Sequence, residues 1–285
     1  MKKLFLIGVA CVALLAAPPV NAADLGTRQP YETPPVIAPV PIFTWTGCYL
    51  GGQVGGGWGH NKLSDPSGAF FAGTGEAIRV NTSGFLGGGQ VGCDWQFAPN
   101  WVIGIEGAAA WADLKGHTLD VFTHTTGGGP FPSPPPSTST ATGTFSAKTD
   151  FLASATGRIG WAWDRWLLYA KGGAAWDHDK YSFIGRVTVP GILNGFAPFD
   201  FTASETRIGW TAGAGIEWAF WSNWSAKLEY DFYDFGSRRV IFVSTVNNGR
   251  APVPADVDQQ IHTVKFGINY RFGWGKAPAP LVARY

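Results

Sequence analysis

The sequence predicts an all-β fold, an eight-stranded antiparallel up-and-down transmembrane β-barrel with four long extracellular loops. Three observations lead to this prediction. Apolar and polar residues alternate with a period of two along eight segments. Short and long connections alternate between these segments. Tryptophans gather on the apolar face of the segments, towards their ends.

The eight segments are separated by stretches rich in proline, glycine and small polar residues. They cover about residues 46–59, 83–97, 101–113, 148–163, 166–179, 204–220, 224–235 and 260–273. The tight connections lie at 98–100, 164–165 and 221–223, and the long ones at about 60–82, 114–147, 180–203 and 236–259. An even number of strands with tight turns at one end and long loops at the other is typical of an outer-membrane barrel.

The segment at 101–113 illustrates the two faces that each strand presents. Trp101, Ile103, Ile105 and Trp111 share one face, whereas Glu106 lies on the other with small residues. Ten residues separate the two tryptophans, which at about 3.3 Å per residue and a tilt of about 40° spans roughly 25 Å of membrane. The apolar face therefore meets lipid, and the tryptophans mark its two edges.

The same assignment applies to the other tryptophans. We expect a membrane girdle made of Trp58, Trp95, Trp101, Trp111, Trp161, Trp163, Trp166, Trp176, Trp210, Trp218 and Trp224. In a soluble β-sandwich these rings would lie mid-strand in a core instead of near the strand ends.

The opposite face carries charged residues among glycine, alanine, serine and threonine. We expect a lumen ion network made of Asp94, Glu106, Arg158, Lys171, Arg207, Glu217, Lys227, Glu229, Asp231, Lys265 and Arg271. The side chains of an eight-stranded barrel just fill its lumen, and buried charges must be paired. We interpret these charges as interior packing in preference to a transport path.

Composition narrows the class of protein further. Charged residues make up 14% of the chain, against about 25% in ordinary soluble domains. The net charge of +1 gives no basic patch for a nucleic-acid partner.

The N-terminus predicts export. Lys2 and Lys3 precede an apolar run at 4–17, and small residues precede a cleavage site after Ala22, as in a secretory signal peptide. We therefore divide the chain into a signal peptide (1–22), a proline-rich periplasmic linker (23–42), the barrel (43–273) and a C-terminal tail (274–285).

Other motifs give no catalytic or cofactor site. Gly87, Gly89 and Gly92 match G-x-G-x-x-G, but a strand follows instead of the helix that a dinucleotide site requires. The five histidines fall in or next to the predicted long loops without metal-ligand spacing: His60, His117, His124, His178 and His262. We predict no enzyme, no cofactor and no metal.

Two cysteines remain after the predicted cleavage. Cys48 and Cys93 lie on the outer face near the tight-turn end of adjacent strands, where opposed Cβ atoms are about 4.5–5.5 Å apart. We predict a cross-strand disulfide; the alternative is two free thiols in the headgroup region.

The first strand region, Phe43-Thr44-Trp45-Thr46-Gly47-Cys48-Tyr49-Leu50-Gly51, resembles the TWTGFYVG opening of small alphaproteobacterial outer-membrane proteins. These are known as outer-membrane immunogenic proteins or porin-family, OmpA-like β-barrels. Residues 88–92, 157–164, 168–170 and 264–272 carry the resemblance further. It implies an eight-stranded barrel that is an abundant surface antigen and supports envelope integrity, with haem-binding or adhesin members.

The resemblance also has two departures. Family members usually end at an aromatic residue that the assembly machinery recognises. Phe272 matches that signal, but the chain continues to Tyr285. Family members also often have aromatic residues where Cys48 and Cys93 stand.

The sequence thus predicts an integral outer-membrane protein with structural and surface-interaction roles. Expected partners are outer-membrane lipid and lipopolysaccharide, the barrel-assembly machinery and, through residues 23–42, the peptidoglycan. The alternatives are a pore for ions or small solutes, a loop-mediated haem-binding or adhesin protein, and an envelope enzyme.

Overall fold

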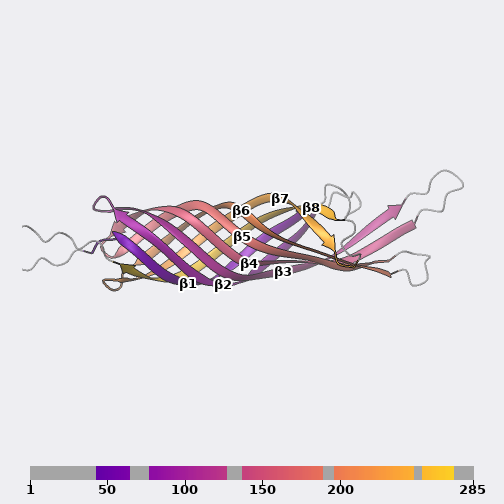
Figure 1. The fold of residues 1–285 in the computed structure, drawn as a ribbon, viewed down its shortest axis with the longest axis horizontal. Helices are drawn as coiled ribbons and strands as arrows, with labels where there is room; N and C mark the ends of the chain where they lie inside the picture. Colours follow the sequence, from indigo (N-terminus) through magenta and orange to yellow (C-terminus); the bar gives the residue numbers. More distant parts are fainter. Residues whose placement is uncertain (1–42, 65–76, 127–136, 189–195, 247–251, 273–285) are drawn as a thin grey trace, which may run out of the picture. The chain divides into compact units, whose positions relative to one another are not determined.

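A computed structural model of the chain describes residues 43–64, 77–126, 137–188, 196–246 and 252–272. These residues form β1 (Gly47–Ser64), β2 (Ala77–Gln96), β3 (Trp101–Thr126), β4 (Ser137–Trp163), β5 (Trp166–Thr188), β6 (Phe196–Trp218), β7 (Trp224–Ser244) and β8 (Val253–Phe272). Each strand pairs with the next, and β1 pairs antiparallel with β8, so the sheet closes into a barrel (Figure 1). The predicted eight-stranded up-and-down barrel is confirmed. No helix within the described part of the chain is long and apolar enough to cross a membrane.

The tight turns lie where the sequence predicts them. β4 ends at Trp163 and β5 begins at Trp166, so Asp164 and Arg165 alone form that turn. Asp164 adopts a φ of 52°, a left-handed conformation that aspartate tolerates better than most residues and that tight hairpins require.

The strands extend well beyond the predicted boundaries at the other end of the barrel. β3 continues to Thr126 and β4 begins at Ser137, within the range 114–147 that we expected to be a loop. The ranges 60–82, 180–203 and 236–259 likewise contribute strand residues. The predicted long loops are therefore too long.

The reason is an inversion of the hydrophobic pattern. Within the membrane band the apolar residues face outwards, but beyond it Leu63, Phe145 and Phe242 face inwards and are buried, while Lys62 and Lys180 are exposed. Water, not lipid, surrounds this part of the wall, so the apolar side of each strand turns to the interior.

On β4 and β7, a β-bulge produces the inversion. Between Thr149 and Phe151, β4 has one more residue than β5, and Thr149 and Leu152 both point inwards and are buried. β7 has one more residue than β8 between Asp234 and Gly236. An extra residue exchanges the inner and outer faces of the strand.

The lumen is filled by alternating apolar and polar layers, which can be followed along β5. From the tight-turn end, its inward side chains include Leu167, Lys171, Ala175, Asp179 and Phe183, all buried. The three apolar layers among them belong to three separate hydrophobic clusters.

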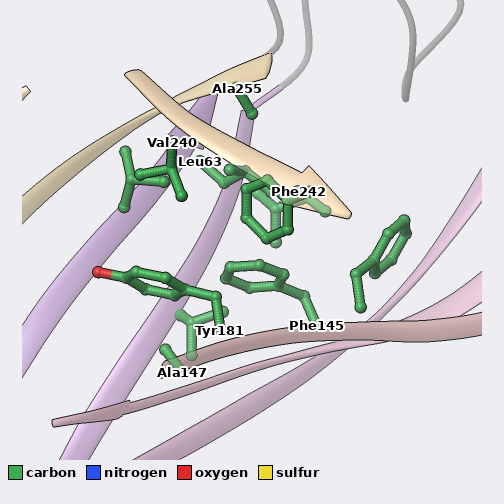
Figure 2. Packing of buried hydrophobic residues seen from close by; sticks show 11 residues of the cluster. Leu63, Phe145, Ala147, Tyr181, Val240, Phe242 and Ala255 are labelled. Atoms are coloured by element: carbon green, nitrogen blue, oxygen red, sulfur yellow. The ribbon is translucent and has the colours of Figure 1, made fainter. Parts of the chain in front are cut away.

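The outermost cluster closes the end of the barrel away from the tight turns. Its residues are Leu63, Ile78, Val80, Phe145, Ala147, Tyr181, Phe183, Val240, Phe242, Ala255 and Val257. Figure 2 shows the rings of Phe145, Tyr181 and Phe242 gathered in the lumen, with centroids 6.1–6.3 Å apart. We refer to this cluster as the outer plug.

Candidate functional site

The polar layer nearest the tight turns is built from four charged side chains on the even-numbered strands. Arg158 of β4 donates to Asp94 of β2 from Nε at 2.7 Å and from Nη2, and to Glu217 of β6 from Nη1 at 3.3 Å. Arg271 of β8 donates to the same two carboxylates, at 2.9 Å each. Two acids and two bases thus alternate around the lumen.

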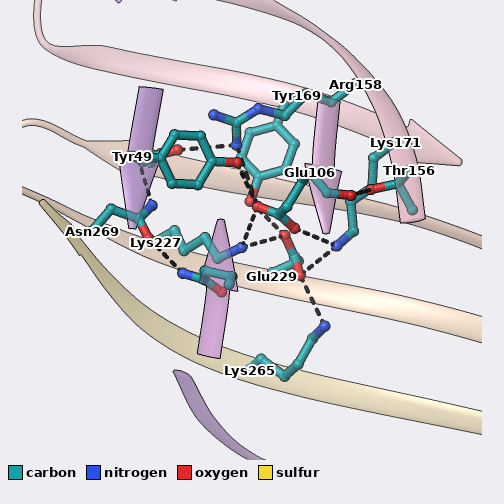
Figure 3. A network of polar contacts seen from close by, with 12 residues as sticks. Tyr49, Glu106, Thr156, Arg158, Tyr169, Lys171, Lys227, Glu229, Lys265 and Asn269 are labelled. Carbon is teal, nitrogen blue, oxygen red and sulfur yellow. Dashed lines mark hydrogen bonds and ion pairs between the residues drawn. The ribbon is translucent and has the colours of Figure 1, made fainter. Parts of the chain in front are cut away.

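A second group of charges lies next to this ring. Lys171 Nζ lies 3.1 Å from Glu106 and 2.7 Å from Glu229. Lys227 Nζ contacts the same two carboxylates at 2.9 and 3.1 Å. Lys265 Nζ lies 3.0 Å from Glu229. Figure 3 shows the three lysines converging on the two glutamates from different strands.

Two tyrosines connect the groups. Tyr49 Oη donates to Glu106 at 2.7 Å, and Tyr169 Oη donates to Glu229 at 2.7 Å. The Arg158 guanidinium lies 4.8 and 5.0 Å from the centroids of these two rings. A Cβ at Gly215 would lie 2.5 Å from Tyr169 Oη, so this glycine provides space for the ring.

The charges of this assembly, which we call the lumen network, balance. The five acids are Asp94, Glu106, Glu217, Glu229 and Asp231, and the five bases are Arg158, Lys171, Lys227, Lys265 and Arg271. None is more than 6% exposed. Breaking one such buried pair leaves an uncompensated charge, which typically costs about 3–5 kcal/mol.

Arg207 lies apart from the ten other predicted lumen charges. It is completely buried in a separate polar layer, with Nε 3.9 Å from Asp179 Oδ2 and Nη1 donating to Val257 O at 3.0 Å. Asp179 also accepts hydrogen bonds from Thr149 at 2.6 Å and Gln259 at 3.1 Å. Grouping Arg207 with the network was therefore wrong, because the apolar layer that contains Ala175 separates the two.

Sequence reasoning missed several polar partners. Ser225 and Asn269 bond to Glu217 Oε1 at 2.5 and 3.0 Å, and Gln90 donates to Asn269 at 2.6 Å. All three are buried. Their position on the inward face of the strands was the available signal. Uncharged polar residues are common on that face, so the sequence does not show which of them bond to the charged groups.

The outer wall carries the predicted tryptophans in two rows. Towards the tight turns lie Trp95, Trp101, Trp161, Trp163, Trp166, Trp218 and Trp224, and towards the other end lie Trp58, Trp111, Trp176 and Trp210. Trp176 is partly exposed, and the exposure of the others runs from 38% to 76%. Exposed Leu50, Ile105, Leu228 and Phe266 lie between the rows.

No charged side chain faces outwards between the two rows among the residues that the structure describes. A continuous apolar belt of this kind is far larger than the exposed patches of soluble proteins. It has the height and the aromatic borders of a lipid-facing band.

The predicted disulfide is confirmed. Cys48 and Cys93 are register partners of β1 and β2, and their sulfurs are bonded. Phe272, the predicted assembly signal, ends β8, is 46% exposed and pairs with Cys48. The signal peptide, the linker and the tail lie outside the described residues.

The histidines, which we expected in or next to the long loops, all lie within strands. His117 and His178 are on outward positions of β3 and β5, and His60 and His262 are on β1 and β8. Both ring nitrogens of His178 already lie within hydrogen-bond distance of hydroxyls, at 3.0 Å from Thr206 and 3.3 Å from Ser204. The described residues contain no group of three or more His, Cys, Asp or Glu side chains suited to a metal ion.

Comparison with known proteins places these features in context. Residues 43–272 match the outer membrane protein β-barrel domain family. The 31 kDa outer-membrane immunogenic protein of Brucella melitensis biotype 1 is 29% identical over 277 residues, which cover 95% of this chain and 100% of that protein.

Solved structures with a similar fold have lower sequence identity. Ail, the attachment invasion locus protein of Yersinia pestis, is 15% identical with a TM-score of 0.33, covering 80% of this chain and 99% of that one. The outer membrane protease OmpT from Escherichia coli is 9% identical with a TM-score of 0.41, covering 81% of this chain and 98% of that one.

Proposed function

The chain belongs to the outer membrane protein β-barrel domain family, and from this premise we propose that it is a closed structural barrel. It reinforces the outer membrane and presents its extended outer end for surface interactions. It performs no catalysis, and its lumen is not a permeation path.

One observation carries this proposal, namely the filled lumen. The ten charges of the lumen network neutralise each other within the barrel, and apolar layers lie on both sides of it. A permeation path needs groups that can release their contacts to a passing solute. Here most of the contacts join side chains of different strands, so they keep the lumen closed.

The extended strands support the surface-interaction part of the proposal. Beyond the outer tryptophan row the wall continues as paired strands, with β3 and β4 in register to Thr126 and Ser137. Pairing within the sheet holds outward side chains such as Lys115, Lys148 and Lys180 in defined positions, which favours recognition.

Planar-bilayer recording of the refolded full chain tests closure. We expect no conductance steps above background once insertion has been verified by the heat-dependent gel shift of a folded barrel. Regular steps that change in size in Arg158→Met would overturn the proposal in favour of a small pore.

A deletion strain tests the structural role. Loss of the protein should sensitise cells to detergent and to bulky antibiotics, and the intact gene should restore resistance. Unchanged resistance would contradict a role in envelope integrity, and altered lipid A or peptidoglycan profiles would instead indicate an enzyme.

The proposed partners can be tested separately. We propose that Phe272 is read by the barrel-assembly machinery and that residues 23–42 contact the peptidoglycan. Removal of 23–42 should abolish co-sedimentation with peptidoglycan sacculi and leave barrel folding intact. Retention of co-sedimentation would exclude the linker as the contact.

A further inference from the structure

Charge returns to the outer wall just beyond the outer tryptophan row. Lys115 of β3, Lys148 of β4 and Lys180 of β5 are direct cross-strand neighbours. The exposed fractions of the three side chains are 59%, 39% and 58%. Like charges directly opposite each other destabilise a sheet unless nearby opposite charges compensate for the repulsion.

Two aspartates hold the row in place. Asp113 lies 2.8 Å from Lys115 and 3.6 Å from Lys148, and Asp150 lies 2.5 Å from Lys148 and 2.6 Å from Lys180. The bulge places Asp150 on the outer face. Three bases and two acids leave one net positive charge, and each ammonium keeps donors free for another anion.

The ion pairs favour the charged forms of Lys148 and Asp150. The hydrogen bond to Asp150 raises the pKa of Lys148 above its usual value. Hydrogen bonds from Lys148 and then Lys180 hold the pKa of Asp150 below its usual value. Both shifts favour the charged state at the centre of the row.

A groove of about 580 Å³ adjoins the row across β4 to β7. Lys148 and Lys180 line it together with hydroxyls of β4, β5 and β6, among them Ser182 and Ser204, and Ile241 contributes an apolar side. Ammonium groups suit phosphate or carboxylate, hydroxyls suit sugars, and the apolar side suits the faces of sugar rings.

The groove lies at the level of a saccharide head group. Lys180 is four residues beyond Trp176, or about 10 Å further from the membrane centre for a tilted strand. This end is opposite the tight turns and so faces the cell exterior. The outer leaflet there presents a glycolipid with a phosphorylated saccharide head.

From this arrangement we propose that Lys115, Lys148 and Lys180, together with the adjoining groove, form a binding site for the phosphorylated saccharide head group of lipopolysaccharide in the protein's own outer leaflet. This site rests on the proposed function, in which the extended end of the barrel faces the cell exterior. It deepens that function by naming the residues through which the barrel binds the surrounding leaflet.

Binding of purified rough-type lipopolysaccharide to the refolded full chain tests the site. The double variant Lys148→Gln/Lys180→Gln should bind the phosphorylated glycolipid about tenfold or more weakly than the wild type, because charge-assisted hydrogen bonds are lost. With enzymatically dephosphorylated glycolipid, wild type and double variant should bind alike. Equal wild-type affinity for the two glycolipids would overturn the proposal.

Lys62→Gln provides a matched control. Lys62 is an exposed, outward-facing lysine on β1, four strands from β5 in the closed ring. This variant should retain wild-type affinity within about twofold, because Lys62 belongs neither to the row nor to the lining of the groove. An equal loss in Lys62→Gln would show diffuse attraction and no site.

The result of the binding experiment can be distinguished from the result of the conductance test of the proposed function. Conductance by the wild type would refute closure and leave a positive binding result standing. A free saccharide that lacks the lipid, yet competes as strongly as the intact glycolipid, would contradict a site for the protein's own leaflet and point to a soluble ligand.

Discussion

Removing the Cys48–Cys93 disulfide should weaken the barrel by an amount that the structure allows to be calculated. The bond joins β1 to β2 on the outer face, close to the end with the tight turns. Cys48→Ser/Cys93→Ser removes it, and the backbone hydrogen bonds of the strand pair can stay in place. The main effect therefore falls on the unfolded chain, which regains the freedom of an open loop.

The magnitude follows from the size of that loop. The two cysteines are 45 residues apart. For a loop of this length the chain-entropy relation gives about 13 cal/mol/K, or about 4 kcal/mol at room temperature. Measured losses are often smaller than this relation gives, so we expect the free energy of unfolding to fall by about 2–4 kcal/mol.

Urea unfolding of refolded protein, followed by tryptophan fluorescence in detergent or vesicles, measures the difference. Reduced wild type should lose as much stability as the double variant, and Cys48→Ser alone should match both. A loss under about 1 kcal/mol in all three samples would refute the loop-closure reasoning. A reduced wild type as stable as the oxidised protein, beside a weakened variant, would show that the serines cause the loss.

Three further predictions concern the interior and the lysine row. Arg158→Met should lower the free energy of unfolding by about 3–5 kcal/mol because it leaves buried carboxylates unpaired; the exposed Arg239→Met should cost under about 1 kcal/mol. Phe145→Ala should cost about 3–5 kcal/mol by emptying space in the outer plug. Asp150→Asn should destabilise near pH 7, and this penalty should shrink as the pH falls below the usual carboxyl pKa. A carboxylate with a lowered pKa stabilises above its unfolded pKa and loses that contribution as pH falls through the folded one.

Chemical denaturation measures all three. Equal losses in Arg158→Met and Arg239→Met would contradict the role of burial in the lumen network. A cost under about 1 kcal/mol for Phe145→Ala would show that the outer plug collapses around the gap. A penalty for Asp150→Asn that does not shrink as the pH is lowered would exclude its charge as the cause.

Much of the wall could be predicted from the sequence. The alternation between Trp101 and Trp111 sets which side of β3 meets lipid, because a strand has two faces and lipid accepts apolar side chains alone. The tight turns follow from short polar interruptions, and the disulfide follows because Cys48 and Cys93 share a face at the same end of neighbouring strands.

The tertiary structure decided where along the barrel the surroundings of the wall change from lipid to water. It also decided how the interior divides into polar and apolar layers. Alternation alone does not say whether lipid or water covers the outer face, so the sequence around Leu63 and Phe242, where the pattern inverts, predicts loops instead of strands. A one-residue bulge at Asp150 then exchanges faces locally.

The partition of the lumen charges likewise depends on register. Arg207 and Arg158 both face inwards, but their heights along the barrel are set by the stagger between strands. One therefore joins the lumen network and the other lies beside Asp179, beyond an apolar layer. The sequence by itself determined the two faces of each strand, whereas the stagger of the closed sheet determined which charges meet, because pairing depends on distance in space and not on periodicity along one strand.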